Sequence, residues 1–140
     1  MKTRFRYSMS GPGLRPLLDF RVVGLPPEKT FLGLVDSGSN PTYLDARIAD
    51  ELGISSRLTN PGETWLGANK FVTREGSIEL VVGQYRWEST VRFAENWNLW
   101  HMILGLHDLF ELFKVDVDAE TLITELTPKP DHPRLTRVPG

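Results

Sequence analysis

The sequence contains no cysteine among its 140 residues. This absence excludes disulfide bonds, thiol nucleophiles and cysteine-ligated zinc together, and it is compatible with a reducing compartment. Long apolar runs are also missing, because none approaches the roughly 20 residues of a membrane-spanning helix. The basic start, residues 1–7, is not followed by the apolar run of a secretory signal. We therefore expect a soluble, cytoplasmic protein with no membrane partner.

Neither sign of charge predominates in the chain. The chain has 16 Lys and Arg against 18 Asp and Glu, a net charge of -2, and acidic and basic residues alternate along it. Such a chain presents no basic field, so we expect no nucleic-acid partner. The histidines at 101, 107 and 132 are too scattered for a metal set, and no glycine-rich phosphate loop occurs. We expect no metal and no cofactor.

The length fits one compact domain with an ordinary core, given 40% hydrophobic and 24% charged residues. We expect an N-terminal extension over residues 1–16 and a folded domain over 17–127. Residues 128–140 are rich in proline and polar residues. This composition predicts a flexible tail.

Short β-strands dominate the predicted secondary structure. Apolar and β-branched runs predict strands over 17–23 and 30–35. The alternation over 85–93 predicts a strand that forms a hairpin with 77–82 through Gly83 and Gln84. A second hairpin is expected between 114–118 and 121–126.

Two helices are expected to interrupt these strands. The first would begin with Asn40 as its N-cap and Pro41 at its first position, and it would end at Gly53. Its apolar positions at helical spacing are Leu44, Ile48 and Leu52. The second helix is expected over 106–113.

One segment carries candidate chemistry. The apolar residues 31–35 lead directly into Asp36-Ser37-Gly38, and this arrangement occurs once in the chain. Two carboxylates that share one proton can hydrolyse a peptide bond, because one accepts a proton from the attacking water while the other protonates the carbonyl oxygen. An Asp-Ser-Gly triplet is also common as a capped turn between a strand and a helix, and that alternative stays open.

The segment 31–40 resembles the Asp-Ser/Thr-Gly active-site signature of aspartic proteases. A second landmark, residues 101–109, resembles the apolar-apolar-Gly strand and C-terminal helix of the same family. A chain of this length with one such signature resembles the retropepsin-like (retroviral-type, clan AA) aspartic proteases. The resemblance runs from Leu17 to about Leu126. It implies a mainly β fold, a retropepsin-like acid protease β-barrel with one or two short helices. It also implies an aspartic-type endopeptidase, a hydrolase that is active as a homodimer.

The resemblance implies a role for each residue of the triplet. Asp36 would share a proton with its two-fold mate, Ser37 would lock the two active-site loops together, and the backbone N–H of Gly38 would lie beside the carboxylate. Residues 63–72 would form the flap that closes over a peptide or protein substrate. The candidate substrate-binding residues are Leu66, Gly67, Ala68 and Asn69.

Two departures from the family's pattern concern substrate contacts and dimerisation. Ser39-Asn40-Pro41 follows the triplet where the family often has alanine and then a small or acidic residue. Leu106 and His107 follow Gly105, so the arginine that viral proteases use there for an intersubunit ion pair is missing. A dimer would need other contacts.

Other chemical interpretations find less support in the sequence. The stretch 116–121 superficially resembles a phosphotransferase or calcium loop, but the required glycine and glutamate are missing, and a hairpin turn is expected. Neither Ser37 nor Ser39 lies in a Gly-x-Ser-x-Gly elbow. Without a basic groove, the four tryptophans indicate a core or a substrate wall. A second hypothesis stays open, in which the same fold is a non-catalytic module for dimerisation or peptide binding.

Overall fold

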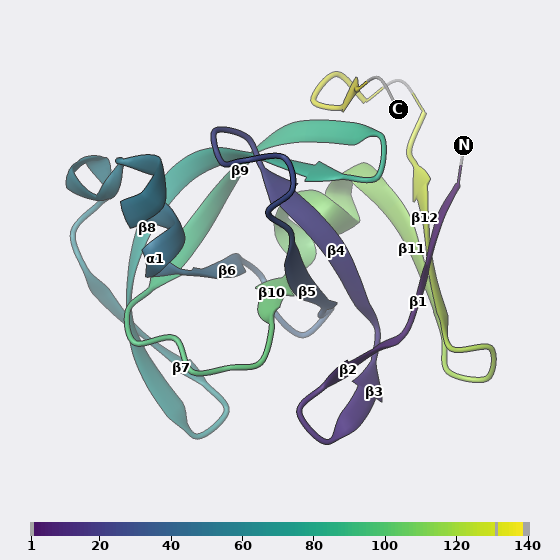
Figure 1. Cartoon of the computed structure of the whole chain (residues 1–140), viewed down its shortest axis with the longest axis horizontal. Helices are drawn as coiled ribbons and strands as arrows, with labels where there is room; N and C mark the ends of the chain where they lie inside the picture. The colour runs from purple at the N-terminus through teal and green to yellow at the C-terminus, as the bar shows by residue number, and fades with distance from the viewer. Residues whose placement is uncertain (1, 131, 139–140) are drawn as a thin grey trace.

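A closed β-barrel forms the centre of the molecule (Figure 1). This computed structural model describes residues 2–130 and 132–138. Six strands pair in the ring order β9–β6–β10–β5–β4–β8, and β8 pairs with β9 to close it. Their bounds are β4 (Leu17–Val22), β5 (Phe31–Val35), β6 (Thr42–Asp45), β8 (Asn69–Val82), β9 (Tyr85–Ala94) and β10 (Met102–Leu104). The predicted mainly β fold with a barrel and short helices is confirmed.

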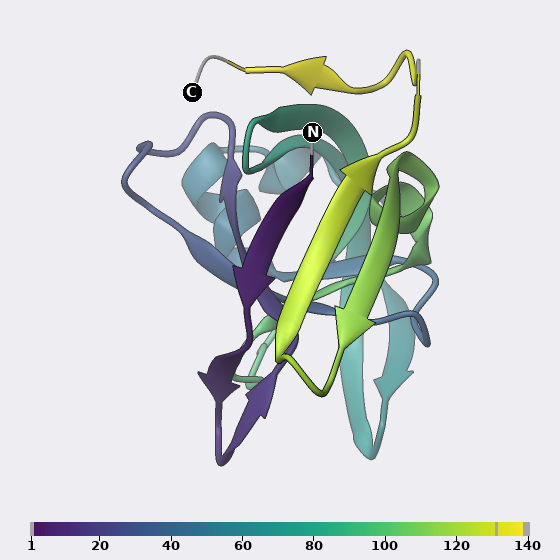
Figure 2. The same ribbon diagram turned by 90° about the vertical axis from the view of Figure 1, so that its right-hand side faces the viewer.

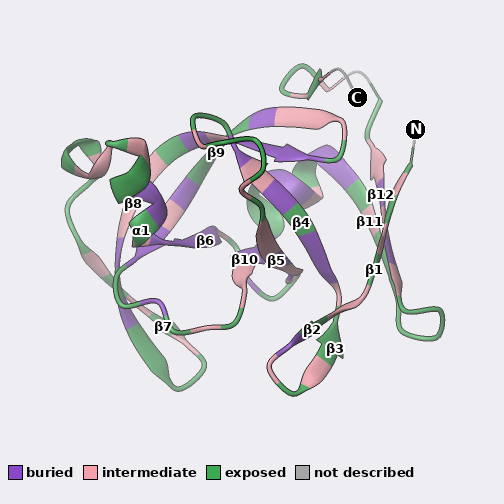
Figure 3. Cartoon of the chain, in the orientation of Figure 1, coloured by how far each residue is buried: buried purple, intermediate pink, exposed green. Residues whose placement is uncertain are grey.

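The longest hairpin of the barrel follows the predicted alternation. β8 and β9 pair antiparallel from Thr73↔Ala94 to Val82↔Tyr85, and Gly83 takes a positive φ of 57° in the turn. Side chains alternate across a strand, so one face of β9 enters the core. Trp87, Val91 and Phe93 are almost fully buried there, and Figure 3 shows the barrel strands as the most buried part of the chain.

A small sheet lies beside the barrel. Its strands β1 (Thr3–Arg6), β12 (Ile123–Pro128) and β11 (Phe113–Asp118) run side by side in that order (Figure 2). The predicted hairpin over 114–126 is confirmed. Along the chain, β2 (Ser8–Ser10) and β3 (Gly13–Arg15) come between β1 and β4 and form a separate two-stranded hairpin.

The two ends of the chain contact the rest of the fold. β1 pairs with β12, and β13 (Thr136–Arg137) pairs with β9. Lys129 N donates to Leu112 O at 2.9 Å. The predicted boundaries at 16/17 and 127/128, and the flexibility of the tail, stay predictions; residues 1, 131, 139 and 140 lie outside the described residues.

The first predicted helix begins later than expected. Residues 42–45 form the buried strand β6, and helix α1 covers Ala46–Leu52. Asp45, not Asn40, is its N-cap, since the Asp45 carboxylate accepts from Arg47 N at 3.0 Å. The expected start was wrong because β6 pairs with both β9 and β10, and this tertiary pairing overrides a fortuitous helical spacing at Leu44. Gly53 ends the helix with a φ of 73°, as predicted.

The second predicted helix is shorter and interrupted. The helical segment η2 covers Leu106–Phe110, but His107 and Asp108 have non-helical angles, and Asp108 takes a positive φ of 72°. Phe113, expected in this helix, begins β11. Two further elements complete the fold, the 3₁₀ turn η1 (Ser55–Arg57) and strand β7 (Gly62–Leu66). Across the described ranges 2–130 and 132–138, every helix is too short or too polar to cross a membrane.

Candidate active site

Asp36 lies at the carboxyl end of a barrel strand. β5 pairs in parallel with β10, with Val35 opposite Leu104, and Asp36 N donates to Leu104 O at 3.0 Å. Val35 N donates to Pro16 O at 3.0 Å from the other side. The backbone on both sides thus fixes where β5 ends and where the half-buried Asp36 carboxylate emerges.

The residues after Asp36 form a tight turn around its carboxylate. Gly38 N donates to Asp36 Oδ1 at 2.9 Å, and Ser39 N donates to the Asp36 carbonyl at 3.3 Å. A Cβ on Gly38 would lie 3.1 Å from Oδ1, so the glycine lets the backbone approach the carboxylate closely. Ser37 is exposed beside this turn.

Gly105 and the two residues after it pack against residues 39–41 of the Asp36 loop. Leu106 N donates to Ser39 O at 2.7 Å, and His107 N donates to Asn40 O at 2.8 Å. A Cβ on Gly105 would lie 2.3 Å from Pro41 O and 2.6 Å from Ser39 O, which backbone atoms cannot tolerate. The start of η2 is therefore fitted directly against the Asp36 loop.

A cavity of about 490 Å³ opens over Asp36. A small hydrophobic cluster that includes Tyr43 and Ile103 forms its floor, and this cluster is separate from the main barrel core. The tip of the β7–β8 hairpin forms another wall. The lining residues are Asp36, Gly38, Ser39, Asn40, Pro41, Tyr43, Trp65, Leu66, Gly67, Leu99 and Ile103. An elongated, partly apolar ligand could therefore contact the carboxylate and the hairpin together.

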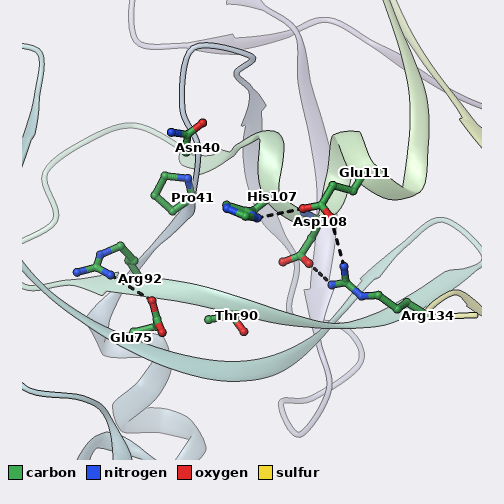
Figure 4. A pocket seen from close by; sticks show the side chains of 9 residues that line it. All are labelled: Asn40, Pro41, Glu75, Thr90, Arg92, His107, Asp108, Glu111 and Arg134. Carbon is green, nitrogen blue, oxygen red and sulfur yellow. Dashed lines mark hydrogen bonds and ion pairs between the residues drawn. The ribbon is translucent and has the colours of Figure 1, made fainter.

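A second cavity, of about 590 Å³, shares Asn40 and Pro41 with the first as lining residues (Figure 4). Its charged side chains come from β8, β9, η2 and the C-terminal segment, and they pair with one another. Arg92 Nη1 lies 3.2 Å from Glu75 Oε2, and His107 Nδ1 lies 3.0 Å from Glu111 Oε1. These charges are largely neutralised within the cavity.

The buried Asp108 is the centre of that charged cluster. It accepts from Ser89 Oγ on β9 and forms an ion pair with Arg134, which also donates to Glu88 O at 3.0 Å. The N–H of Asp108 in turn donates to the Glu111 carboxylate, and this bond is the main reason that the pKa of Glu111 is lowered. Leu106, and not an arginine, follows Gly105, and Arg134 from the C-terminal segment pairs with the carboxylate of Asp108.

His101 lies on the Asp36 side of the molecule. Its Nδ1 is 2.5 Å from Ser10 Oγ on β2, and its carbonyl accepts from Trp97 Nε1 at 3.2 Å. Partial burial lowers the pKa of His101, the Arg15 cation lowers it further, and the nearby negative charge of Asp36 opposes both effects. Asp36 and Arg15, a residue of the N-terminal β2–β3 hairpin, thus both affect the pKa of His101.

Comparison with solved structures identifies the architecture. The chain superposes on a retropepsin-like aspartic protease from Rickettsia conorii with a TM-score of 0.58 and 16% identity, over 90% of this chain and 91% of that chain. It also superposes on the retroviral protease-like domain of Ddi1 from Leishmania major, with a TM-score of 0.55 and 13% identity, over 84% of this chain and 98% of that one. The chain has the retropepsin-like fold. No protein-family model and no curated protein matches the sequence.

Within the retropepsin-like fold, the cavity over Asp36 unites part of the predicted site. Asp36, Gly38, Leu66 and Gly67 line it, while Ser37, Ala68 and Asn69 do not. The predicted flap is a hairpin in which Leu66 pairs with Asn69, so Gly67 and Ala68 form its two-residue turn. Sequence reasoning did not assign Tyr43, Leu99 and Ile103 to the cavity, since apolar residues in strands and loops carry no signal for a cavity wall.

Proposed function

We propose that this protein is an aspartic endopeptidase whose catalytic dyad is formed by Asp36 from two chains of a homodimer. One observation carries the proposal: a single carboxylate stands at the end of a barrel strand, bonded by Gly38 N–H, and lines a cavity that the tip of a hairpin also lines. The retropepsin-like fold of the chain agrees with it.

The proposed reaction consumes one water for each peptide bond. One Asp36 carboxylate accepts a proton from the water as its oxygen attacks the scissile carbonyl carbon, and the protonated Asp36 of the second chain donates a proton to the carbonyl oxygen. The tetrahedral intermediate then collapses, the C–N bond breaks, and the amide nitrogen leaves as an amine after it is protonated by the dyad. The hairpin tip, with Leu66 and Gly67, would cover the substrate backbone during these steps.

Product mapping by mass spectrometry tests this proposal. Wild type and Asp36→Asn are incubated with a diverse peptide mixture between acidic and neutral pH. We expect cleavage by the wild type alone, with a preference for apolar side chains near the cut because the cavity floor is apolar. Equal cleavage by both proteins would point to another site or a contaminant and would refute the role of Asp36.

A second candidate function is peptide binding without hydrolysis. β7 is the last strand at its end of the large sheet, and among the described residues one of its edges has no paired strand and could take up a peptide strand. Saturable peptide binding that yields no product at any pH, with both proteins folded, would favour this function.

A further inference from the structure

The N-terminal β2–β3 hairpin has an exposed apolar face. Met9 and Leu14 are directly paired across it, so their side chains lie on the same face, and they are 57% and 53% exposed. The hairpin is a two-stranded sheet, and within the described ranges neither strand pairs with any other. A hairpin of this size is at best marginally stable alone in water. It therefore depends on other contacts.

The opposite face of the hairpin is anchored beside the candidate active site. Ser10 is buried and bonds to His101, and a Cβ on Gly11 would lie 3.0 Å from Nε1 of Trp100. The next residue after β3, Pro16, accepts from Val35 N, one residue before Asp36. Through these contacts, the hairpin is fixed relative to the Asp36 loop while Met9 and Leu14 point away from His101.

Further exposed apolar groups lie near the hairpin. Trp100 is 77% exposed beside Gly11, and Trp65 on the β7 side of the cavity is 66% exposed. In both Figure 1 and Figure 2 the β2–β3 and β7–β8 hairpins project from the same end of the molecule. Methionine and tryptophan are enriched in the cores of protein interfaces. This end of the molecule has the composition of a contact surface.

The ends of the chain have partners of their own. Every residue of β1 pairs with β12, and β13 pairs with β9. One carboxylate, that of Asp36, lines the cavity within the described part of the chain, so a dyad needs a second copy to supply the other. The occupant that completes the site is thus the same chain, and the unpartnered hairpin lies beside it.

We propose that the homodimer is held by the β2–β3 hairpin, with Met9 and Leu14 of each chain packed against the second copy and Trp100 at the edge of this contact. The inference rests on the proposed function, because the need for a second Asp36 is what selects a second copy as the partner. Leu106 follows Gly105, where viral proteases have an arginine that holds their dimer together. In this proposal the hairpin supplies a dimer contact instead.

Sedimentation velocity over a range of protein concentrations tests the proposal. The wild type is expected to be a dimer, and Met9→Lys combined with Leu14→Lys should raise the dimer dissociation constant about 30-fold or more, as for buried interface anchors. Val23→Lys is the matched control. Val23 is also exposed, at 41%, but it follows the end of β4 that is remote from the hairpin and its N–H donates to Glu79 O, so this variant should remain a dimer. Circular dichroism verifies that each variant is folded.

Single-cysteine variants give an independent measurement, because the chain has no native cysteine. Under mild oxidation, Met9→Cys should form a covalent dimer, and Val23→Cys should not. Asp36→Asn should keep the dimer whether or not it loses activity, which separates failure of the interface from failure of the chemistry. A monomeric wild type, or a wild-type-like dimer in the double lysine variant, would overturn the proposal. So would loss of peptide binding by the double lysine variant while its dimer persists, because the hairpin would then be a substrate wall.

Discussion

Two cavities share the Asn40–Pro41 segment as a wall and differ in their electrostatics. On one side, Asp36 emerges over an apolar floor, bonded by Gly38 N–H, and is the one charged side chain among the described residues that line the cavity. On the other side, Glu75, Arg92, Asp108 and Arg134 are paired with one another. The larger cavity is the one whose charges are already satisfied.

The comparison separates a structural use of charge from a chemical one. Asp108 is buried, and its carboxylate oxygens are already bonded to Ser89 and Arg134, so this aspartate links parts of the fold. Asp36 is half-buried, accepts one hydrogen bond from Gly38 N, and faces a cavity where a ligand can reach its carboxylate. Volume alone would favour the charged side, whereas the pairing of charges favours the Asp36 side as the candidate site.

The largest effect is expected where the two sides meet, at Gly105. Gly105→Ala places a Cβ against the carbonyls of Ser39 and Pro41, which would push the shared wall away from η2. We expect a loss of about 3 kcal/mol in the free energy of unfolding, the upper range for overpacking. Urea denaturation measures it. Gly62→Ala is the control, since the nearest atom to its new Cβ would be 3.6 Å away. Equal stability of the two variants would show that Gly105 does not pack tightly against residues 39–41.

The second prediction contrasts the two aspartates directly. Asp108→Ala removes the acceptor for Ser89 and the partner of Arg134, so we expect a loss of about 2 kcal/mol, as for hydrogen bonds to a charged group. Asp36→Ala should cost less than about 1 kcal/mol, because it removes one partly exposed hydrogen bond. Thermal and urea unfolding of both variants check this order. The reverse order would contradict the assignment of a structural role to Asp108.

A double-mutant cycle refines the same contrast. The Arg134 side chain is 39% exposed, so Arg134→Ala alone should destabilise the fold by about 1 kcal/mol or less. Because Arg134 and Asp108 share one contact, their effects should not add when both are replaced. Additive losses would mean that the C-terminal segment is not held through Asp108.

The sequence predicts the elements around the Asp36 cavity far better than those around the charged cavity. Apolar runs and glycine turns locate β4, β5, β9 and residues 77–82 of β8, since these segments alternate or are continuously apolar. By contrast, β6 has four consecutive buried residues, and one of them, Leu44, fell on a helical spacing with Ile48. Only its pairing with β9 and β10 makes this segment a strand.

The long-range pairs of the charged cavity have no local signature. Asp108 bonds to Ser89, 19 positions away, and to Arg134, 26 positions away. In the Asp36 cavity, Asp36, Gly38 and the hairpin turn are local features of the sequence. Tyr43 and Ile103 become walls only because β6 and β10 are neighbours in the barrel.

The smallest expected effect concerns His101, whose pKa reports the charge of Asp36. Burial, followed by Arg15, lowers this pKa below 6.5, so the unfolded chain binds a proton at His101 before the folded chain does. The stabilisation is therefore complete above pH 6.5 and is lost as the pH falls toward the lowered pKa. His101→Gln should show less of this loss when urea denaturation is compared across that range.

Asp36→Asn sharpens the same measurement, because it removes the negative charge that raises the pKa of His101. The NMR titration of the His101 ring should move to lower pH in this variant, while Asp108→Asn, on the opposite side of the shared wall, should leave it in place. An unchanged titration in Asp36→Asn would mean that the carboxylate and the histidine do not share an electrostatic environment. The link between the N-terminal hairpin and the candidate site would then rest on packing alone.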